Sequence, residues 1–565
     1  MSNSGTSDRS ALAHVRPRRT LAPFEGASSP KLVWGNPLYL AAIHERALCS
    51  MNHIFPVLLI VCTAAVQAQP AIQWQKCYGG TSTEKAFAMQ PTTDGGYVLT
   101  GYTESWDGDV TMNHGLYDLW VVKVDSVGDL QWQRSLGGTR YDRAAAIQQT
   151  SDGGYIVAGI TDSNDGDVSG NHSTNQYDAW VVKLNASGGI QWQKCLGGTN
   201  GDQAEDISQT TDGGYLLAGI TMSLDGDASG GHGLQDGWLV KLGATGNIEW
   251  QKCLGGTNGD WVNSVLQTSD GGYIATGTTQ SNDGDVFGGH GDNDAWVVKL
   301  DATGNIQWQK CLGGTGSEQA YSTLQTSDGG YILVGTASSN DWDVSGNHGS
   351  GDCWVVKLDG AGNMQWQKCL GGTDADFALA VQQATDGGYL VAGQVGSSDG
   401  DASGHHGMVD GWLVKLDDLG ALEWQRCLGG SGLEALQDIE QITDGVYVVA
   451  GQTGSHDGDV SGVHGPNYED FWLVKLGLAD LGIEDPQPLD FSLAPNPAHT
   501  EVHVRSAVPI ARLELVDPAG RRMSTMLSPK ANSALDVSTL TNGLYIAHVV
   551  LVDGRTITET VMVAH

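Results

Sequence analysis

One short segment returns at almost constant spacing through most of this chain of 565 residues. It reads W-Q-[KR]-x-[LY]-G-G, and successive copies lie 58 or 60 residues apart. Self-similarity at a fixed period of this length is typical of repeat architectures, in which each repeat forms one supersecondary unit. The sequence therefore predicts one unit repeated seven times over residues 72–477. The tryptophans that open the segments are Trp74, Trp132, Trp192, Trp250, Trp308, Trp366 and Trp424.

Each repeat has the pattern of four short strands. In the repeat that begins at residue 306, we expect strands at 306–311, 320–325, 331–334 and 354–358. The segment Asp328-Gly329-Gly330 suits a tight hairpin, because these residues tolerate positive φ angles. The third strand is apolar on both faces, which indicates burial between stacked sheets. Four strands without helical periodicity favour an all-β fold, a seven-bladed β-propeller, with an open β-solenoid as the alternative.

The two ends of the repeat region are expected to pair with each other. The region begins on a strand at 72–75 that has no partner in the first repeat, and it ends on a strand at 472–476. In the middle of the array the corresponding strands are hairpin partners. Pairing the first strand with the last would close the ring and remove two exposed sheet edges.

The repeats resemble the kelch-like, Gly- and Trp-rich propeller repeats of secreted bacterial proteins. The matching signature over residues 72–477 is D-G-G-Y, then D-G-D-x-S-G, then D-x-W-[VL]-V-K-L. Propellers host binding, scaffolding and catalysis alike, so this resemblance indicates a fold and no particular chemistry.

The composition changes after the last repeat. A linker at 478–490 contains two prolines, and residues 491–565 have the alternation and turns of a small β-sandwich. This segment contains the motifs P-N-P, D-x-x-G and N-G-x-Y and resembles the type A sorting domain of the type IX secretion system. The matching sorting residues are Pro495, Asn496, Pro497, Gly520, Gly543 and Tyr545. The resemblance implies export, contact with the type IX secretion machinery, and a location in the medium or attached to the outer membrane.

An apolar run at 54–66 has the length of a signal-peptide core and is too short to span a bilayer. We expect a signal peptide at 51–68, cleaved after Ala68, and no transmembrane span in the mature chain. Residues 1–50 precede this segment and have no clear periodicity. Two interpretations of them stay open: an extension from a mis-assigned start, with Met51 as the natural first residue instead of Met1, or a leader that is cleaved or disordered.

Charge and cysteine placement exclude some classes of partner and bond. The chain has 29 basic and 65 acidic residues, a formal net charge of −36, which disfavours nucleic acid and anionic lipid as partners.

Six cysteines occupy one position of the repeat, on sheets expected about 10 Å apart, which is too far for disulfides. They are interpreted as small buried apolar residues. These six are Cys77, Cys195, Cys253, Cys311, Cys369 and Cys427.

The D-G-D-x-S-G loop has the spacing of an EF-hand calcium loop, with oxygen side chains at positions 1, 3, 5 and 12 and Gly at 6. Ca²⁺ is therefore a candidate cofactor, and plain turn formation by Asp and Gly is the alternative. Each loop also carries a His, for which a structural role is expected, and the sixth repeat's is taken as His405. The candidate ligands are Asp225, Asp227, Ser229 and Asp236; Asp283, Asp285 and Asp294; Asp341, Asp343, Ser345 and Asp352; and Asp399, Asp401, Ser403 and Asp410.

No catalytic constellation is visible in the sequence. Catalysis in a repeat protein needs groups that break the repeat, and those that do so form no acid–base pair or nucleophile set. The leading function is an exported surface or secreted scaffold that binds extracellular glycan or protein. The alternatives are a secreted polysaccharide hydrolase of endoglucanase type, which needs an asymmetric carboxylate pair, and a purely structural adhesion protein. The residues that break the repeat are Trp106, Arg143, Trp261, Trp342 and Cys353.

Overall fold

The computed structural model describes residues 69–173, 175–466, 468–477, 491–506, 509–518, 521–527, 533–552 and 556–565. The expectations for residues 1–50, the signal peptide, the linker at 478–490 and Gly520 fall outside these residues. All 35 regular elements in the described part are strands. No helix there is long and apolar enough to cross a membrane.

Seven antiparallel four-stranded sheets lie within the described part of residues 71–477. Their first strands are β2 (Glu84–Pro91), β6 (Asp142–Gln149), β10 (Asp202–Gln209), β14 (Asp260–Gln267), β18 (Glu318–Gln325), β22 (Asp376–Gln383) and β26 (Glu434–Thr443). The second strands are β3 (Tyr97–Thr103), β7 (Tyr155–Thr161), β11 (Tyr215–Thr221), β15 (Tyr273–Thr279), β19 (Tyr331–Ala337), β23 (Tyr389–Val395) and β27 (Val446–Thr453). The third strands are β4 (Asp118–Val124), β8 (Asp178–Leu184), β12 (Asp236–Leu242), β16 (Asp294–Leu300), β20 (Asp352–Leu358), β24 (Asp410–Leu416) and β28 (Asp470–Gly477). The fourth strands are β5 (Leu130–Leu136), β9 (Ile190–Leu196), β13 (Ile248–Leu254), β17 (Ile306–Leu312), β21 (Met364–Leu370), β25 (Leu422–Leu428) and β1 (Ala71–Tyr78).

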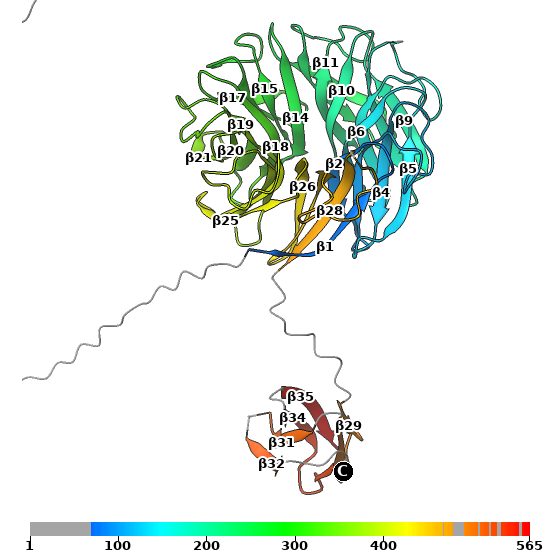
Figure 1. Ribbon diagram of the computed structural model, residues 1–565, viewed down its shortest axis with the longest axis vertical. Helices are drawn as coiled ribbons and strands as arrows, with labels where there is room; N and C mark the ends of the chain where they lie inside the picture. The colour runs from blue at the N-terminus through cyan, green and yellow to red at the C-terminus, as the bar shows by residue number, and fades with distance from the viewer. Residues whose placement is uncertain are drawn as a thin grey trace, which may run out of the picture. The chain divides into compact units, whose positions relative to one another are not determined.

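The sheets form a closed ring around a common axis. Each first strand contacts the first strand of the next sheet, and β26 contacts β2, so the series returns to its start. In Figure 1 the labelled first strands gather toward the centre, whereas β1, β5, β9, β21 and β25 lie at the periphery. The first strands therefore surround the axis, and residues about 58 positions apart in sequence become neighbours there.

The expected pairing of the two ends is confirmed. Strand β1 pairs antiparallel with β28, with Gln75 opposite Val474. Trp472 Nε1 donates to Gln75 Oε1 at 2.8 Å between these two strands. The same tryptophan-to-glutamine bond occurs within the other sheets, for example from Trp296 to Gln309 at 2.9 Å. The first and last strands of the region thus complete one sheet between them.

Most of the core lies between consecutive sheets. The tryptophans of the D-x-W segments are almost fully buried, as are the second strands on both faces, in agreement with their apolar sequence. The tryptophans of the W-Q segments pack against the tyrosine of D-G-G-Y, with ring centroids 5.6–6.4 Å apart. The seven described cysteines, Cys353 among them, are free thiols, and all but Cys77 are buried, so the interpretation of the repeat cysteines as apolar filler is confirmed.

A buried lysine explains the D-G-G turn. In the fifth sheet Lys357 is 2% exposed, and its Nζ lies 2.9 Å from Asp328 and 3.1 Å from the Leu358 carbonyl. A Cβ on Gly330 would lie 2.3 Å from that carbonyl and 2.6 Å from Nζ, so the second glycine leaves room for the lysine. The pairing recurs in six of the seven sheets, at 2.9–3.0 Å.

The C-terminal segment has a three-stranded and a four-stranded sheet in its described residues. The first has the order β29-β30-β33 and the second β32-β31-β34-β35. Val502 and Val504 of one sheet share a core with Leu513, Val549 and Val561 of the other. The strands are β29 (Phe491–Ala494), β30 (Glu501–Ser506), β31 (Ile510–Val516), β32 (Arg522–Leu527), β33 (Ser533–Asp536), β34 (Gly543–Leu551) and β35 (Thr556–Val563).

Candidate functional site

The repeats diverge where they face the axis. The second and fourth residues of each first strand, here called the axial residues, are half-buried, except for the buried Ala435. The second residues are Lys85, Arg143, Gln203, Trp261, Gln319, Phe377 and Ala435. The fourth residues are Phe87, Ala145, Glu205, Asn263, Tyr321, Leu379 and Gln437, a different amino acid in every sheet. Variation at these positions within an otherwise repetitive strand makes the axial surface a place where a unique site can form.

A β-bulge turns the fourth residue away from the regular ladder. The pairing of every first strand with its second strand shifts register around this residue, for example between Ala204 and Asp206. A bulged residue is unpaired, and its side chain is aimed differently from those of its neighbours. The side chains of these residues reach the adjacent first strands: Arg143 Nη2 lies 3.6 Å from Glu205 Oε1, and its guanidinium lies 5.6 Å from the Phe87 ring.

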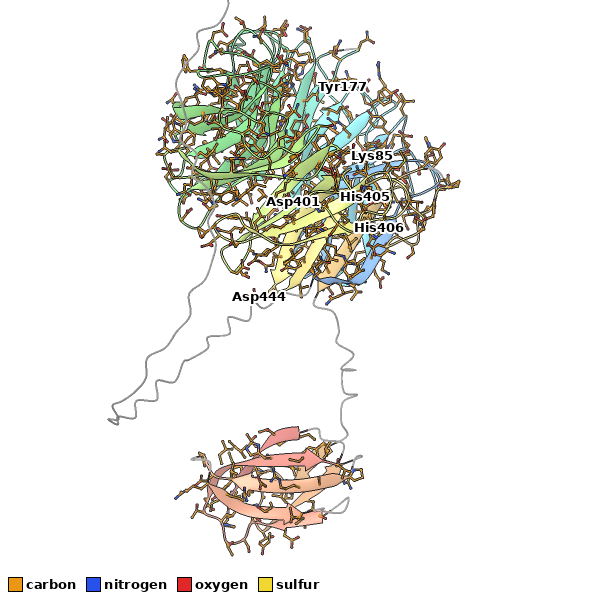
Figure 2. All side chains as sticks on the ribbon, turned by 60° about the vertical axis from the view of Figure 1, so that its left-hand side comes forward. Lys85, Tyr177, Asp401, His405, His406 and Asp444 are labelled. Carbon is orange, nitrogen blue, oxygen red and sulfur yellow. The ribbon has the colours of Figure 1, made fainter. Side chains whose placement is uncertain are left out.

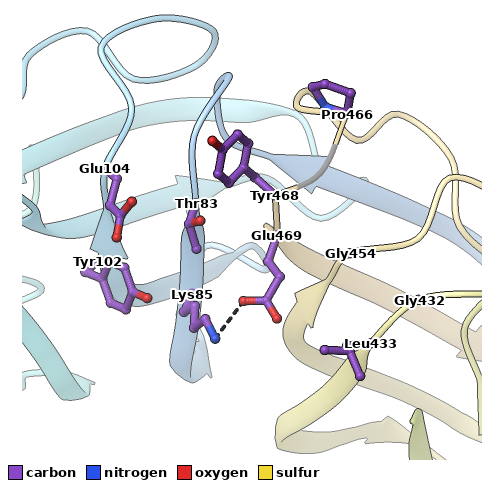
Figure 3. Close-up of a pocket in the computed structure, with 10 residues that line it drawn as sticks. All are labelled: Thr83, Lys85, Tyr102, Glu104, Gly432, Leu433, Gly454, Pro466, Tyr468 and Glu469. Carbon is purple, nitrogen blue, oxygen red and sulfur yellow. Dashed lines mark ion pairs between the residues drawn. The ribbon is translucent and has the colours of Figure 1, made fainter. Parts of the chain in front are cut away.

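One axial pocket lies where the last sheet meets the first, with a cavity of about 520 Å³ (Figure 3). Lys85 of β2 forms an ion pair with Glu469, the residue before β28, at 2.7 Å. Tyr102 and Glu104 line the same pocket. Burial raises the pKa of Glu104, although the nearby Lys85 opposes this shift. The pocket therefore joins a fixed ion pair to an aromatic ring and a partly desolvated carboxyl group.

A second axial pocket, of about 290 Å³, spans the fourth and fifth sheets. We call it the amide pocket, and it is lined by Trp261, Asn263, Thr278, Gln280, Asn293, Gln319 and Tyr321. Gln280 Nε2 donates to Asn293 Oδ1 at 2.9 Å, and the Tyr321 hydroxyl donates to Gln319 Oε1. Burial raises the pKa of Tyr321, so this hydroxyl stays protonated. Two of the repeat-breaking residues, Arg143 and Trp261, are thus axial.

The other repeat-breaking residues lie elsewhere. Trp106 and Trp342 are 67% and 73% exposed, in the loops that follow β3 and β19. The Trp342 ring lies 5.0 Å from the ring of His290 in the preceding sheet. Cys353 is fully buried on β20, and burial raises the pKa of its thiol. These residues join neither axial pocket among the described residues.

The proposed calcium ligands are distributed over different hydrogen bonds. In the third sheet, Asp225 accepts from the Thr199 N–H at 2.8 Å and Asp227 from the Gly197 N–H at 3.4 Å. Ser229 accepts from Gln251 at 2.6 Å, and the buried Asp236 accepts from the His232 N–H at 2.8 Å. Acceptance of backbone N–H groups is what the turn interpretation expects.

The same contacts recur in the other loops. The position-1 residues Asp283, Asp341 and Asp399 accept a threonine N–H at 2.8 Å. At position 3, Asp285, Asp343 and Asp401 accept a glycine N–H at 3.3–3.4 Å. At position 5, Ser345 and Ser403 accept from glutamine side chains at 2.5–2.7 Å. At position 12, Asp294, Asp352 and Asp410 accept histidine N–H groups at 2.6–3.1 Å. Among the described residues, no group of three His, Cys, Asp or Glu side chains has a geometry that could hold a metal ion, and calcium stays a prediction.

The loop histidine of the sixth repeat is His406 and not His405. His406 donates its N–H to Asp410 at 2.9 Å, and its Nδ1 lies 2.7 Å from the same carboxylate. This matches His348 and Asp352 in the fifth sheet. The choice of His405 was wrong, although the spacing already identifies His406. His232, His290 and His348 each precede the third-strand aspartate by four residues, as His406 does. Figure 2 labels both histidines, which lie in the loop between β23 and β24.

Sequence reasoning missed a second set of buried acids, which begin the first strands. In the fourth sheet, Asp260 accepts from the Gly256 N–H at 2.7 Å and from Ser281 Oγ at 2.8 Å. Asp236 Oδ1 and Asp260 Oδ2 both lie within 3.0 Å of the point where a Cβ on Gly255 would stand. Two carboxylates thus face each other at this junction between sheets. The Oδ1 atom of the third-strand aspartate has no hydrogen-bond partner in any of the seven described sheets: Asp118, Asp178, Asp236, Asp294, Asp352, Asp410 and Asp470.

The described sorting residues hold together the ends of the C-terminal segment. Asn496 Nδ2 donates to the Thr560 carbonyl, and the Met562 N–H donates to Asn496 Oδ1, both at 2.8 Å. The peptide bonds before Pro495 and Pro497 are cis. Tyr545 is buried, and its hydroxyl donates to the Thr541 carbonyl at 2.9 Å. Gly543 is the first residue of β34.

Comparison with known proteins separates this segment from the ring. Residues 492–564 match the family described as secretion system C-terminal sorting domain. The regulatory protein FlaEY of Caulobacter vibrioides is 26% identical over 205 residues, which are 34% of this chain and 21% of that protein. The chain therefore spans about a fifth of the length of that curated relative.

Solved structures are only weakly similar to the chain. PorZ, an essential bacterial surface component of the type IX secretion system of Porphyromonas gingivalis, is 11% identical, with a TM-score of 0.37. That match covers 86% of this chain and 60% of PorZ. Sqt1 from Chaetomium thermophilum is 12% identical, with a TM-score of 0.37 over 70% of this chain and 87% of that one. Likenesses at this level carry no inference about this chain.

The sorting segment identifies the class of the protein. The P-N-P and N-G-x-Y residues that tie its strands together lie inside the matched region. Residues 492–564 belong to the type IX secretion system C-terminal sorting domains, and the protein is secreted or attached to the cell surface.

Proposed function

We propose that residues 72–477 form a seven-bladed β-propeller that binds an extracellular ligand at its axis. In this proposal residues 478–490 are a linker, and residues 491–565 form a small β-sandwich that delivers the propeller through the type IX machinery. The divergence of the axial residues carries the proposal, because the fourth residue differs in all seven sheets while the surrounding signature repeats. The repeated residues form the scaffold, and the varied axial residues form a single asymmetric site.

Binding is favoured over polysaccharide hydrolysis. Burial raises the pKa of Asp206 to about 6 and that of Asp438 to about 7, as a general acid requires. Each of these carboxyls, however, accepts a backbone N–H of the next first strand: Asp206 from Val265 at 2.8 Å and Asp438 from Met89 at 3.0 Å. These contacts support a role in holding neighbouring sheets together.

A blocking substitution tests the site. Ala145→Trp fills the axis from β6, whereas Val127→Trp introduces the same side chain at a 54%-exposed outer turn and serves as the control. The two variants and the parent would be applied to arrays of extracellular polysaccharides, oligosaccharides and peptides. Ala145→Trp is expected to lose the ligands that the parent and the control retain. Equal binding by all three proteins would place the site away from the axis.

Deletion of residues 478–565 tests delivery. The shortened chain is expected to fold and to accumulate in the periplasm, because the described sheets of the ring are complete without this segment. Cell fractionation and protease treatment of intact cells would measure its location. Surface delivery of the shortened chain at the parent's level would contradict the proposed role of the segment.

A further inference from the structure

The amide pocket has no side chain that carries a charge at neutral pH, in a protein whose formal net charge is −36. Its polar groups are amides, the Thr278 hydroxyl, the Trp261 indole N–H and one protonated phenol. A cationic ligand would find no carboxylate in the pocket, and the acidic protein repels an anionic ligand. An entirely apolar ligand would cover these amides and leave them unpaired, which is costly. The lining therefore suits an uncharged ligand that is rich in hydrogen-bonding groups.

Each amide is held by at least one hydrogen bond, and three of them keep a free hydrogen-bonding atom. Asn293 Nδ2 donates to Ser317 Oγ at 2.8 Å, and Asn263 Nδ2 donates to the Ala320 carbonyl at 2.7 Å. Within the described residues, Gln280 Oε1, Gln319 Nε2 and Asn263 Oδ1 have no hydrogen-bond partner. The pocket thus offers two acceptors and one amide donor in a preorganised arrangement. A hydroxyl group donates and accepts, so it can satisfy both kinds of atom.

Trp261 supplies an aromatic surface in the same pocket. It is half-buried, and its Nε1 has no partner among the described residues. A Cβ on Gly259 would lie 2.8 Å from Cη2 of this indole, so the glycine leaves the space in which the ring lies. The corresponding position in the second repeat is Tyr141. Aromatic rings with a polar edge suit ligands that have one apolar and one wet side.

We propose that the amide pocket binds an uncharged oligosaccharide, with the C–H face of one sugar ring on Trp261. Hydroxyls of that sugar donate to Gln280 Oε1 and Asn263 Oδ1 and accept from Gln319 Nε2. The inference deepens the proposed axial binding function and rests on it. It also explains why two aromatic and four amide side chains from two strands and one loop converge at one place in the ring.

Isothermal titration of the full mature protein tests the inference. The neutral probes are cellohexaose, laminarihexaose, xylohexaose, mannohexaose and N-acetylchitohexaose, and the charged controls are hexagalacturonate and fully deacetylated chitohexaose. At least one neutral probe is expected to bind, and neither charged control. Absence of binding by all five neutral probes at millimolar concentration would overturn the proposal.

Substitutions assign the binding to the pocket. Trp261→Ala and Tyr321→Ala are each expected to weaken binding by about tenfold or more, from loss of aromatic contact. Trp261→Phe is expected to restore most of it, and Trp106→Ala, which removes an exposed rim tryptophan, should change nothing. Gly259→Leu tests the same pocket without removing the indole and should also weaken binding. Unchanged affinity in Trp261→Ala and Gly259→Leu would overturn the proposal.

The two levels of inference fail differently. If Ala145→Trp abolishes ligand binding but the Trp261 variants do not, the axial site stands and the sugar assignment is wrong. If the Trp261 variants lose binding to the neutral probe and Ala145→Trp does not, the amide pocket binds sugar independently of a ligand along the axis. Circular dichroism and melting temperature confirm that each variant is folded before its affinity is compared.

Discussion

At the scale of single residues, the main feature is the burial of acids between sheets. Asp142 begins β6, and Asp118 of the preceding sheet raises its pKa, although burial is the larger cause. Its pKa is about 6, as is that of Asp178. The aspartates of the D-G-G turns behave oppositely: hydrogen bonds to Thr150, Gly154 and Lys183 lower the pKa of Asp152 to about 2. The protein thus contains two groups of carboxyls that respond to pH in opposite senses.

Stability is expected to peak near pH 4–5. Asp142 and Asp178 have raised pKa values, so they favour the folded state when they are protonated. Their contribution to folding stability is full below their ordinary pKa of 3.8 and is lost as the pH rises through about 6. The pKa of His348 is raised by its bond to Asp352, so its contribution is also lost as the pH rises. The contribution of Asp152 is lost as the pH falls toward 2. Thermal unfolding between pH 2.5 and 8 should show the peak, and Asp142→Asn should reduce the decline above pH 5. A midpoint that rises steadily to pH 7 would contradict this.

The candidate calcium ligands lead to a second prediction at the scale of single residues. A cation at a loop carboxylate group would relieve charge repulsion and stabilise only the folded state, by about 2.7 kcal/mol per site at a hundredfold excess over Kd. We expect a higher melting temperature in calcium than in chelator. Asp225→Ala with Asp227→Ala would remove one of several independent sites and lower the shift only in part. An identical midpoint in calcium and chelator would show that these carboxylates act as acceptors for turn N–H groups.

At the scale of elements, the hairpin between the first and second strands depends on its two glycines in different ways. Gly329 has φ +82° and open space where a Cβ would stand. Gly330 stands against the Leu358 carbonyl and Lys357 Nζ. In the seventh sheet Val446 takes the place of the second glycine, and Asp444 makes no ion pair with Lys475 among the described contacts.

The two glycines therefore make a matched pair of substitutions. Gly330→Ala is expected to lower the free energy of unfolding by about 2–4 kcal/mol, because its Cβ meets backbone and displaces the lysine. Gly329→Ala should cost only about 1 kcal/mol, from backbone strain alone. Chemical denaturation of both variants measures the difference. Equal losses would mean that the lysine pocket does not require the second glycine.

At the scale of the whole molecule, stability depends on closure of the ring. Strand β1 covers the open edge of β28, and the two come from opposite ends of the repeat region. Deleting residues 72–77 is expected to lower the melting temperature of the entire ring in one transition, because every sheet packs against two neighbours. Deleting the same length from the proposed linker at 478–490 is the control. A truncated ring that melted like the parent would show that closure by β1 adds no stability.

The sequence by itself determined the repeat, the four-stranded unit and the pairing of its ends. Strand alternation and turn residues are local properties, and the unpaired first strand had one matching partner. The sorting segment was also identified, because P-N-P and N-G-x-Y are contiguous motifs.

Only the tertiary structure decided where the axial site lies. A bulge shifts the register of every first strand around its fourth residue, so beyond Asn263 or Tyr321 strand periodicity alone does not assign side chains to a face. The amide pocket joins Trp261 to Gln319, residues 58 positions apart, which become neighbours only when the first strands meet around the axis. The directions of the candidate calcium ligands were undetermined for the same reason. Spacing along a loop does not determine direction, and packing between sheets turns Asp236 inward while Asp225 stays at the surface.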